Sequence, residues 1–339
     1  MALVMRIQAD NQMRVAVLLE QDFCHPSWRF HSFNAAISRE FPDGELFPVR
    51  NNYAVVAEKI ADRRADFQCV ISFCYFSRMR HQAAAMASIG LPLVLYETDT
   101  LLNYRTGYYK FGRLSNFLSI CPVDILVTTG KWSFDRFTAD GQHCFYLPKA
   151  APAAFLSQPN RHSGHFCLFG SFKDPIYADR AALFEQITPS SRFEPMRLVF
   201  PETMTRLRQR LAARRREPGV HRLRFRFSQM AAVLRHYSGV VICDKGLNET
   251  MAKHFEIAAL GLAPFRDNEV VDELEELGYR DGQSMVVYES VDDLREKLNY
   301  YGRHNNQLMA IQHGARAASV HNTWERRASD LKRFLLDRY

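Results

Sequence analysis

Short, continuously apolar runs alternate with longer mixed segments through the first part of the chain. Such runs suit strands that are buried on both faces of a parallel sheet, and the mixed segments place apolar residues on one side, as amphipathic helices do. Strands are expected at residues 15–19, 47–49, 69–73, 93–96, 124–129 and 141–147. The alternation predicts an α/β domain with a Rossmann-like parallel sheet and helices on both faces.

The same alternation restarts after an interrupted segment. Residues 147–152 hold two prolines and residues 158–164 are polar, so we expect a linker here. Further strands are expected at residues 165–169, 197–200, 223–227, 240–243, 262–265 and 286–288, and helices at 291–301, 305–319 and 323–336. The pattern predicts two Rossmann-like domains, over residues 1–152 and 153–320, and a final helix within 321–339.

Length and charge fit this division and add one feature. A chain of 339 residues suits two domains, and 47% apolar with 24% charged residues is the balance of a globular protein. The net charge is +7, with much of the excess in the region Arg206–Arg226. This basic region could bind an anionic surface, nucleic acid or a phosphorylated ligand, or it could be a solvated helix face followed by an edge strand.

The cysteines and the apolar runs bear on the compartment. The seven cysteines show no C-x-x-C spacing, and several lie inside apolar runs, so we expect small buried side chains in a reducing compartment. Residues 1–10 hold no signal-peptide core, and no run approaches the length of a membrane span. The sequence predicts a cytoplasmic protein, which its basic region could also bring to a membrane surface.

A helix, a glycine and a short apolar strand follow one another from Lys253 to Phe265. Gly261 falls where the helix should end, because glycine adopts the left-handed cap conformation without a Cβ clash. Glu256 lies one turn after Lys253, and we expect it to point outward near the carboxyl edge of the sheet, where open α/β sheets bind ligands. The carboxylate could accept bonds from ribose hydroxyls and the lysine could pair with a diphosphate, or the two could form a weak surface ion pair.

Two other places could face phosphate. Gly170 and Ser171 end the first strand of the second domain, where the missing Cβ lets backbone amides approach a ligand, although an ordinary turn has the same pattern. Asp267 and Asn268 precede an acidic helix, and we expect one of them to cap it by accepting from its first-turn amides. A capped helix N-terminus can also hold an anion.

Three residues of the first domain are candidates for a general base. Glu97 and Asp99 follow a predicted strand, where a carboxylate could deprotonate an acceptor hydroxyl or merely orient a loop. His25 lies in the loop after the first strand and titrates near neutrality, although many loop histidines are simply solvated. Asp292 and Asp293 begin a predicted helix and resemble capping residues rather than metal ligands.

The stretch Phe255–Gly261 resembles the Glu-x-x-x-x-Gly signature of group-1 glycosyltransferases with the GT-B fold. Other features resemble the CgeB-like, spore-maturation-type branch of this superfamily. Lys253 stands where that branch usually has arginine, and Asn248 follows a strand as the branch's asparagine does. Four more stretches are similar to parts of that branch. Residues 147–151 resemble its linker entry and residues 169–171 its first donor-domain strand, while residues 286–288 resemble its closing strand and residues 321–327 its final helix.

The resemblance implies a GT-B fold, with two Rossmann-like domains whose parallel sheets face a cleft and a C-terminal helix that crosses back to the first domain. It implies a glycosyltransferase of hexosyltransferase type that takes a nucleotide-diphosphate sugar on the second domain and an acceptor on the first, without an obligatory metal or other cofactor. The implied donor site comprises Gly170, Ser171, Lys245, Asn248, Lys253, Glu256, Asp267 and Asn268.

Two departures from the family pattern leave other functions open. The wider superfamily has an acid eight residues before Glu256, where this chain has Asn248, and an Arg–Lys pair for the diphosphate is not evident. Three residues could replace that pair: Lys245, Lys253 and Arg180. One alternative is a non-catalytic, GT-B-shaped nucleotide-sugar-binding or scaffold protein, and another is a nucleic-acid-modifying glycosyltransferase that uses the basic region. The acceptor stays open among glycans, lipid-linked molecules, proteins and nucleic acid.

Overall fold

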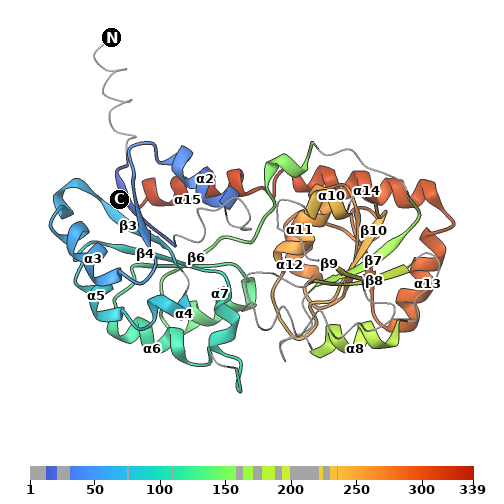
Figure 1. Ribbon diagram of the computed structural model, residues 1–339, viewed down its shortest axis with the longest axis horizontal. Coiled ribbons are helices and arrows are strands. Elements are labelled where there is room, and N and C mark those ends of the chain that lie inside the picture. Colours follow the sequence, from blue (N-terminus) through green and yellow to red (C-terminus); the bar gives the residue numbers. More distant parts are fainter. Residues whose placement is uncertain are drawn as a thin grey trace, which may run out of the picture. The chain divides into compact units, whose positions relative to one another are not determined.

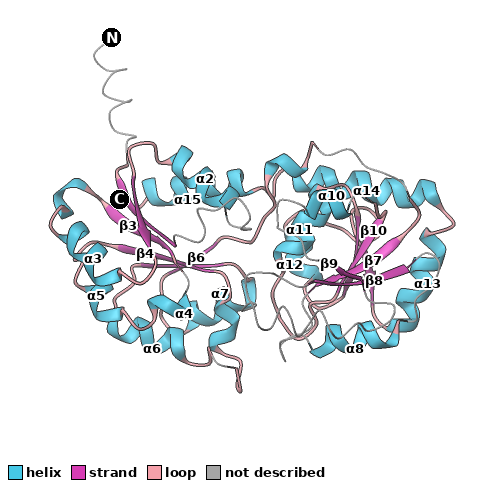
Figure 2. Ribbon diagram, in the orientation of Figure 1, coloured by secondary structure: helices cyan, strands magenta, loops and turns pink. Residues whose placement is uncertain are grey.

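The computed structural model describes residues 13–20, 31–74, 76–108, 110–157, 163–170, 178–187, 193–198, 221–223, 230–234 and 236–339. The chain divides into two compact units, of which unit 1 is Met1–Lys149 with Trp324–Tyr339 and unit 2 is Ala150–Thr323. Each unit is a parallel sheet with helices packed on both of its faces (Figures 1 and 2).

Unit 1 contains a six-stranded sheet in the order β2-β1-β3-β4-β5-β6. Its strands are β1 (Val15–Glu20), β2 (Glu45–Val49), β3 (Cys69–Phe73), β4 (Leu93–Glu97), β5 (Ile125–Thr128) and β6 (Cys144–Tyr146). Its helices are α2 (His31–Glu40), α3 (Tyr53–Ala61), α4 (Phe76–Met79), α5 (Ala83–Ala87), α6 (Arg113–Ile120), α7 (Lys131–Ala139) and α15 (Trp324–Leu336), with 3-10 turns at Arg64–Asp66 and Thr100–Asn103. Four central strands, β1, β3, β4 and β5, are buried along their whole length, which explains their uninterrupted apolar sequences.

Unit 2 contains a six-stranded sheet in the order β12-β11-β10-β7-β8-β9. Its strands are β7 (Phe166–Gly170), β8 (Phe193–Leu198), β9 (His221–Leu223), β10 (Gly239–Ile242), β11 (Ala263–Asp267) and β12 (Val286–Tyr288). Its helices are α8 (Ala178–Gln186), α10 (Met230–Leu234), α11 (Ala252–Ala259), α12 (Val271–Glu276), α13 (Val291–Tyr301) and α14 (Asn305–Ser319), with a 3-10 turn at Ala153–Phe155. β8 begins ahead of the predicted 197–200, because Phe193 already pairs with Phe166 of β7.

In both sheets the first strand lies inside the sheet and has a later strand on each side. The loops that leave the carboxyl ends of two such neighbouring strands run in opposite directions, which creates a switch point. In unit 2 the chain runs from β7 outward to β8 and β9, and then returns to the other side of β7 with β10. In unit 1 the chain places β2 on one side of β1 and β3 on the other. Open parallel sheets bind ligands outside the carboxyl ends of the strands at such switch points. Functional groups are therefore expected where β7 and β10 end, and where β1 and β3 end.

Helix α11 is enclosed along its whole length in unit 2. All eight of its residues are buried, and it packs against α14, β10 and β11. The helix ends before Gly261, which has a φ of +70°, so the expected glycine cap is confirmed. The amide of Gly261 donates to the carbonyl of Ala258 at 2.9 Å, which satisfies one of the last helical carbonyls.

The C-terminal helix α15 belongs to unit 1, where it lies beside α2 (Figure 1). Trp324 is fully buried, with its ring 4.9 Å from that of Phe33. The guanidinium of Arg327 donates to the carbonyl of Pro148 at 3.1 Å, and the hydroxyl of Ser329 donates to Glu40 at 2.6 Å. The expectation that the final helix returns to the first domain is confirmed.

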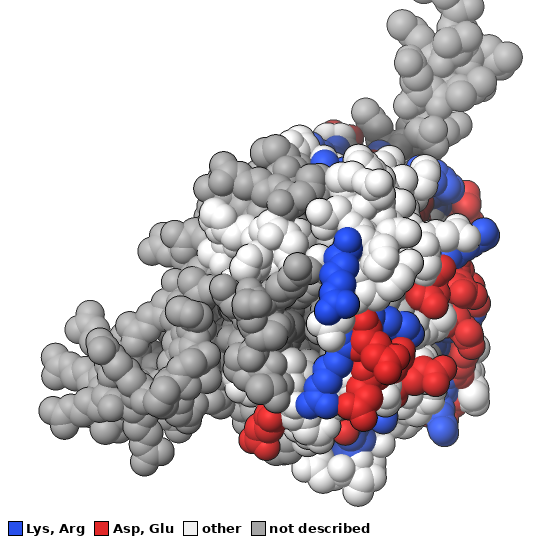
Figure 3. Space-filling model, turned by 90° about the vertical axis from the view of Figure 1, so that its right-hand side faces the viewer, with Lys and Arg blue, Asp and Glu red and all other residues white. Residues whose placement is uncertain are grey.

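On the face of unit 2 that carries α13, acidic and basic side chains lie beside one another (Figure 3). Asp292 pairs with Arg295 and Asp293 pairs with Lys297, while Ser290 caps the helix by accepting from the amide of Asp293. The capping residue is thus Ser290 rather than Asp292, and Asp293 supports the helix start by accepting from the amide of Glu289 at 2.9 Å. No group of three or more His, Cys, Asp and Glu is arranged to hold a metal within the described ranges.

The cysteines fit a globular protein with a packed core. Six cysteines fall in the described part of the chain; all are free thiols and five are buried, as expected of small core residues. In the same part of the chain, no helix has both the length and the apolar character needed to cross a bilayer.

Candidate functional site

Two cationic side chains crowd the end of β7 at the switch point of unit 2. A Cβ placed on Gly170 would lie 2.9 Å from the Cδ and Nη1 atoms of Arg180 and 3.0 Å from the Nζ of Lys253. A side chain at this position would press on both cations, and glycine avoids this close approach. Arg180 is 1% exposed and Lys253 is 7% exposed. The structure therefore concentrates two buried positive charges where the backbone of β7 ends.

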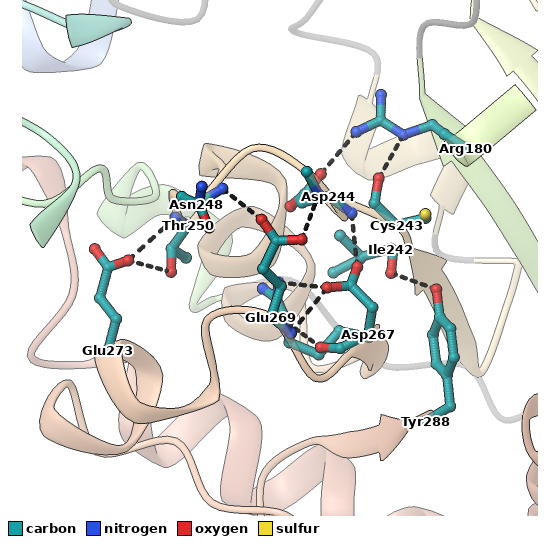
Figure 4. A network of polar contacts seen from close by, with 12 residues as sticks. Arg180, Ile242, Cys243, Asp244, Asn248, Thr250, Asp267, Glu269, Glu273 and Tyr288 are labelled. Carbon is teal, nitrogen blue, oxygen red and sulfur yellow. Dashed lines mark hydrogen bonds and ion pairs between the residues drawn. The ribbon is translucent and has the colours of Figure 1, made fainter. Parts of the chain in front are cut away.

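Arg180 is fixed by the end of β10 (Figure 4). Its Nε donates to the carbonyl of Cys243 at 2.8 Å, and its Nη2 pairs with Oδ1 of Asp244 at 2.7 Å. The other carboxylate oxygen of Asp244 is buried and has no hydrogen-bond partner among the described residues. A guanidinium held in a fixed position suits recognition of an anionic group.

Lys253 and Glu256 lie in successive turns of α11, and both are buried. The expectation that Glu256 points outward is wrong, and so is the alternative of a surface ion pair. Glu256 is fully buried because α11 is enclosed by its own sheet and by α14. A carboxylate is costly to bury, so its place in the interior indicates a specific polar role.

The loop from Asp244 to Thr250 joins β10 to α11 and is held by carboxylates (Figure 4). The amide of Asp244 donates to Asp267 at 2.7 Å, and the amide of Asn248 donates to Glu269 at 2.6 Å. The amide of Gly246 donates to the other oxygen of Glu269. The amide and hydroxyl of Thr250 donate to Glu273, at 3.3 and 3.2 Å.

These contacts correct one expectation about Asp267 and Asn268. Helix α12 begins at Val271, and its N-cap residue makes no side-chain capping bond. The oxygens of Asp267 accept instead from the amides of Asp244 and Glu269, so the carboxylate organises two loops rather than capping a helix. Asn268 is exposed beside it, and its predicted part in donor binding stays a prediction.

The loop presents two of the predicted donor-binding residues to solvent. Lys245 and Asn248 are exposed, whereas Leu247 between them is buried. Asn248 has a φ of +49° and is the one residue other than glycine with a positive φ in the described part of the chain. Asparagine tolerates this left-handed conformation better than most residues do.

His254, next to Lys253 on α11, is fully buried against Tyr279, with ring centroids 4.5 Å apart. Neither of its ring nitrogens has a hydrogen-bond partner among the described residues. Burial, together with the nearby charge of Arg266, holds the pKa of His254 well below 6.5. The imidazole is therefore neutral in the folded protein at pH 7.

We expect this histidine to make the protein less stable in mild acid. The unfolded chain binds a proton at His254 near pH 6.5, whereas the folded chain does not, so stability present above that pH is lost as pH falls. The free energy of unfolding should fall by about 1.4 kcal/mol per pH unit below pH 6.5 from this group. Urea titrations between pH 7 and 5 should show that slope removed in His254→Phe and retained in His313→Phe, an exposed histidine of α14. A His254→Phe variant that keeps the wild-type slope would contradict the assignment.

In unit 1 the structure brings Glu97 and Asp99 together around one lysine. The Nζ of Lys110 lies 3.3 Å from Glu97 and 3.2 Å from Asp99, and the Nζ of Lys149 lies 3.9 Å from the second oxygen of Asp99. Burial raises the pKa of Glu97, while Lys110 acts in the opposite direction. A carboxylate with a raised pKa is better matched to proton transfer near neutral pH than a solvated one.

Glu20, which ends β1 at the switch point of unit 1, was not among the predicted site residues. Its side chain is fully buried, pairs with Arg78 and accepts from the hydroxyl of Tyr53 at 3.3 Å. The pKa of Tyr53 is raised, chiefly by burial. The signal was present, because Glu20 follows an apolar strand in the same way as Glu97 does.

A cavity of about 490 Å³ opens at the carboxyl end of β2, the strand beside β1. It is lined by Pro48, Arg50, Asn51 and Asn52.

Three of the predicted features lie outside the described residues: His25, Ser171 and the Arg206–Arg226 region, apart from residues 221–223.

Comparisons with known proteins agree with this architecture. Residues 203–333 match the family model described as glycosyl transferase-like. HepE from Anabaena, solved in complex with UDP and glucose, is similar with a TM-score of 0.67 and 13% identity over 96% of this chain and all of that one. The trehalose-6-phosphate protein from E. coli bound with UDP-2-fluoro glucose has a TM-score of 0.64 and 9% identity, over 96% of this chain and 99% of that one.

A third similar structure is the lipopolysaccharide outer core galactosyltransferase WaaB in its apo form. Its TM-score is 0.56 at 9% identity, over 95% of this chain and 99% of that one. No curated protein sequence matches the chain. The chain has the GT-B fold, as the resemblance implied, with two parallel-sheet α/β units and a final helix in unit 1.

Proposed function

We propose that the chain is a glycosyltransferase that moves a sugar from a nucleotide-diphosphate sugar to an acceptor. The observation that carries the proposal is the pair of buried cations, Arg180 and Lys253, against Gly170 at the switch point of unit 2. A nucleotide diphosphate gains negative charge as the bond to the sugar breaks, and fixed cations stabilise that charge most where it develops. The match of residues 203–333 and the likeness to structures that contain UDP or a UDP sugar support the same function.

The remaining donor residues receive roles on the same basis. Glu256 would accept from the ribose hydroxyls, and the loop that presents Lys245 and Asn248 would line the donor site. In this proposal Lys253 and Arg180 supply the positive charge around the diphosphate, so transfer would need no metal. Three further parts of the proposal rest on the sequence: the hexosyltransferase type, the CgeB-like branch and the cytoplasmic location. Binding to an anionic surface through the basic region belongs to the same sequence-based part of the proposal.

Unit 1 would bind the acceptor and hold the general base. The candidates are Glu97, Asp99 and His25. Glu97 is favoured by its buried position beside Lys110, because burial raises the pKa of its carboxyl. The base would take the proton from the acceptor hydroxyl as the new glycosidic bond forms and the nucleoside diphosphate leaves.

A non-catalytic nucleotide-sugar-binding protein is the second candidate. It is favoured by Asn248, an amide at the position where the wider superfamily has an acid. Release of nucleoside diphosphate from a nucleotide sugar in the presence of an acceptor panel would exclude it. A nucleic-acid-modifying transferase would instead show binding to DNA or RNA that weakens steeply with salt.

A thermal-shift screen against uridine, guanosine, adenosine and cytidine diphosphates tests the proposal. A ligand that binds only the folded state at a hundred times its Kd stabilises it by about 2.7 kcal/mol, so one of the four should raise the Tm clearly. Lys253→Met should lose most of that shift, because it removes one of the two buried cations, whereas Lys59→Met, at an exposed position of α3, should keep it. No shift with any diphosphate, or an undiminished shift in Lys253→Met, would overturn the proposal.

A further inference from the structure

We infer that Glu269 is a positioning residue, which holds the loop from Asp244 to Thr250 in the conformation that receives the ligand. The ligand itself follows from the proposed function, but the geometry of the loop stands without it. The switch point between β7 and β10 directs a ligand to this loop, because the loop leaves the carboxyl end of β10 beside Gly170.

The bonds to this loop form a ladder beyond the end of the sheet. Alternate amides of the loop donate to carboxylates at the end of β11 and in the residues that follow it (Figure 4). The donors are Asp244, Gly246, Asn248 and Thr250, and the acceptors are Asp267, Glu269 and Glu273. In a continuing parallel sheet these amides would donate to backbone carbonyls, but β11 has already ended at Asp267. Carboxylates thus replace the carbonyls of a neighbouring strand, and the amides stay satisfied.

Glu269 occupies the centre of this ladder. It is the one member of the described ladder that takes two loop amides, with one oxygen on Gly246 and the other on Asn248. Hydrogen bonds from an amide to a carboxylate are stronger than those between neutral groups. The bond to Asn248 is 2.6 Å long and joins the residue whose φ of +49° is disfavoured for most side chains. Glu269 therefore stabilises the least favourable backbone conformation of the loop.

Loss of these two bonds would weaken ligand binding. The loop turns Lys245 and Asn248 to solvent while Leu247 anchors it in the core, and it leads directly into the first turn of α11, where Lys253 lies. Glu269 touches the loop backbone and needs no contact with a ligand to set this arrangement. Its effect on binding should accordingly come through the mobility of the loop.

Glu269→Gln tests the inference, because the amide keeps the shape of the side chain but offers one accepting oxygen instead of two. We expect amide hydrogen exchange at Gly246 or Asn248 to become about tenfold faster, because the substitution removes one charge-assisted hydrogen bond from one of these two amides. The amides of Val240 and Val241 in β10 should keep their rates. The Kd for whichever of the four nucleoside diphosphates the wild type binds best should rise about fivefold or more. Glu275→Gln, an exposed substitution on the nearby helix α12, should change none of these values.

Each outcome decides a separate part of the inference. Unchanged exchange at Gly246 and Asn248 would overturn the loop clamp. Faster exchange at these amides with an unchanged Kd would overturn the positioning role. Exchange that becomes faster in β10 by the same factor as in the loop would indicate general destabilisation and would also overturn that role. If the wild type binds none of the four diphosphates, the proposed function fails, and the exchange rates alone then support or overturn the clamp.

Discussion

Replacing Glu256 with glutamine should lower kcat/KM for the nucleotide sugar by roughly a hundredfold or more. In the proposed site this carboxylate accepts from two ribose hydroxyls, and each bond to a charged acceptor contributes about 1.5–3 kcal/mol. Glutamine keeps one accepting oxygen and turns an amide donor toward the second hydroxyl. The substitution preserves the volume of a fully buried side chain, so the fold should survive. Initial rates of nucleoside diphosphate release, measured with the donor and acceptor found by screening, give the ratio.

A ribose analogue separates recognition from a structural role of Glu256. The wild type should bind the 2′,3′-dideoxy form of its preferred nucleoside diphosphate much more weakly than the natural one, whereas Glu256→Gln should bind both alike. A merely structural carboxylate would weaken both ligands by the same factor and leave the discrimination intact, and that result would refute the ribose assignment. Glu276→Gln, at an exposed position of α12, should behave as the wild type does.

The fold could be predicted because the decisive strands are buried on both faces. β1 and β10 have no polar side to interrupt the apolar run, so the pattern of the sequence reports their position directly. The same enclosure explains the error at Glu256. The periodicity of α11 suggested an outer face, but this short helix is covered on every side, and no local pattern shows how many neighbours a helix will have.

The candidate site could be predicted only in part. Gly170 and Lys253 were found because the end of a strand and the start of a helix have recognisable sequences. Glu269 was missed because its acceptor role depends on amides 21 and 23 residues away in the chain, and such pairings follow from tertiary packing alone. Arg180 was predicted only as one of three residues that could replace the family's Arg–Lys pair at the diphosphate. No local sequence pattern shows that its guanidinium contacts Asp244.

Trp324→Ala should lower the free energy of unfolding of unit 1 by about 3–5 kcal/mol, the usual cost of removing a large aromatic side chain from a core. The indole is fully buried against Phe33, and the ring of Phe33 lies 5.2 Å from Phe73 and 5.1 Å from Tyr96, so the cavity would open inside an aromatic cluster that cannot readily collapse. The helix that Trp324 begins would also lose its main anchor on α2.

Urea unfolding followed by far-ultraviolet circular dichroism measures this effect without relying on the fluorescence of the missing indole. Because two units can unfold in separate steps, the transition of unit 1 should move to lower urea while that of unit 2 stays in place. Val55→Ala is the matched control, since Val55 is half exposed on α3 of the same unit and its truncation should cost less than about 0.5 kcal/mol. A loss below about 1 kcal/mol for Trp324→Ala would mean that α15 does not complete the core of unit 1. A loss shared equally by both transitions would show instead that the last helix stabilises the chain as a whole.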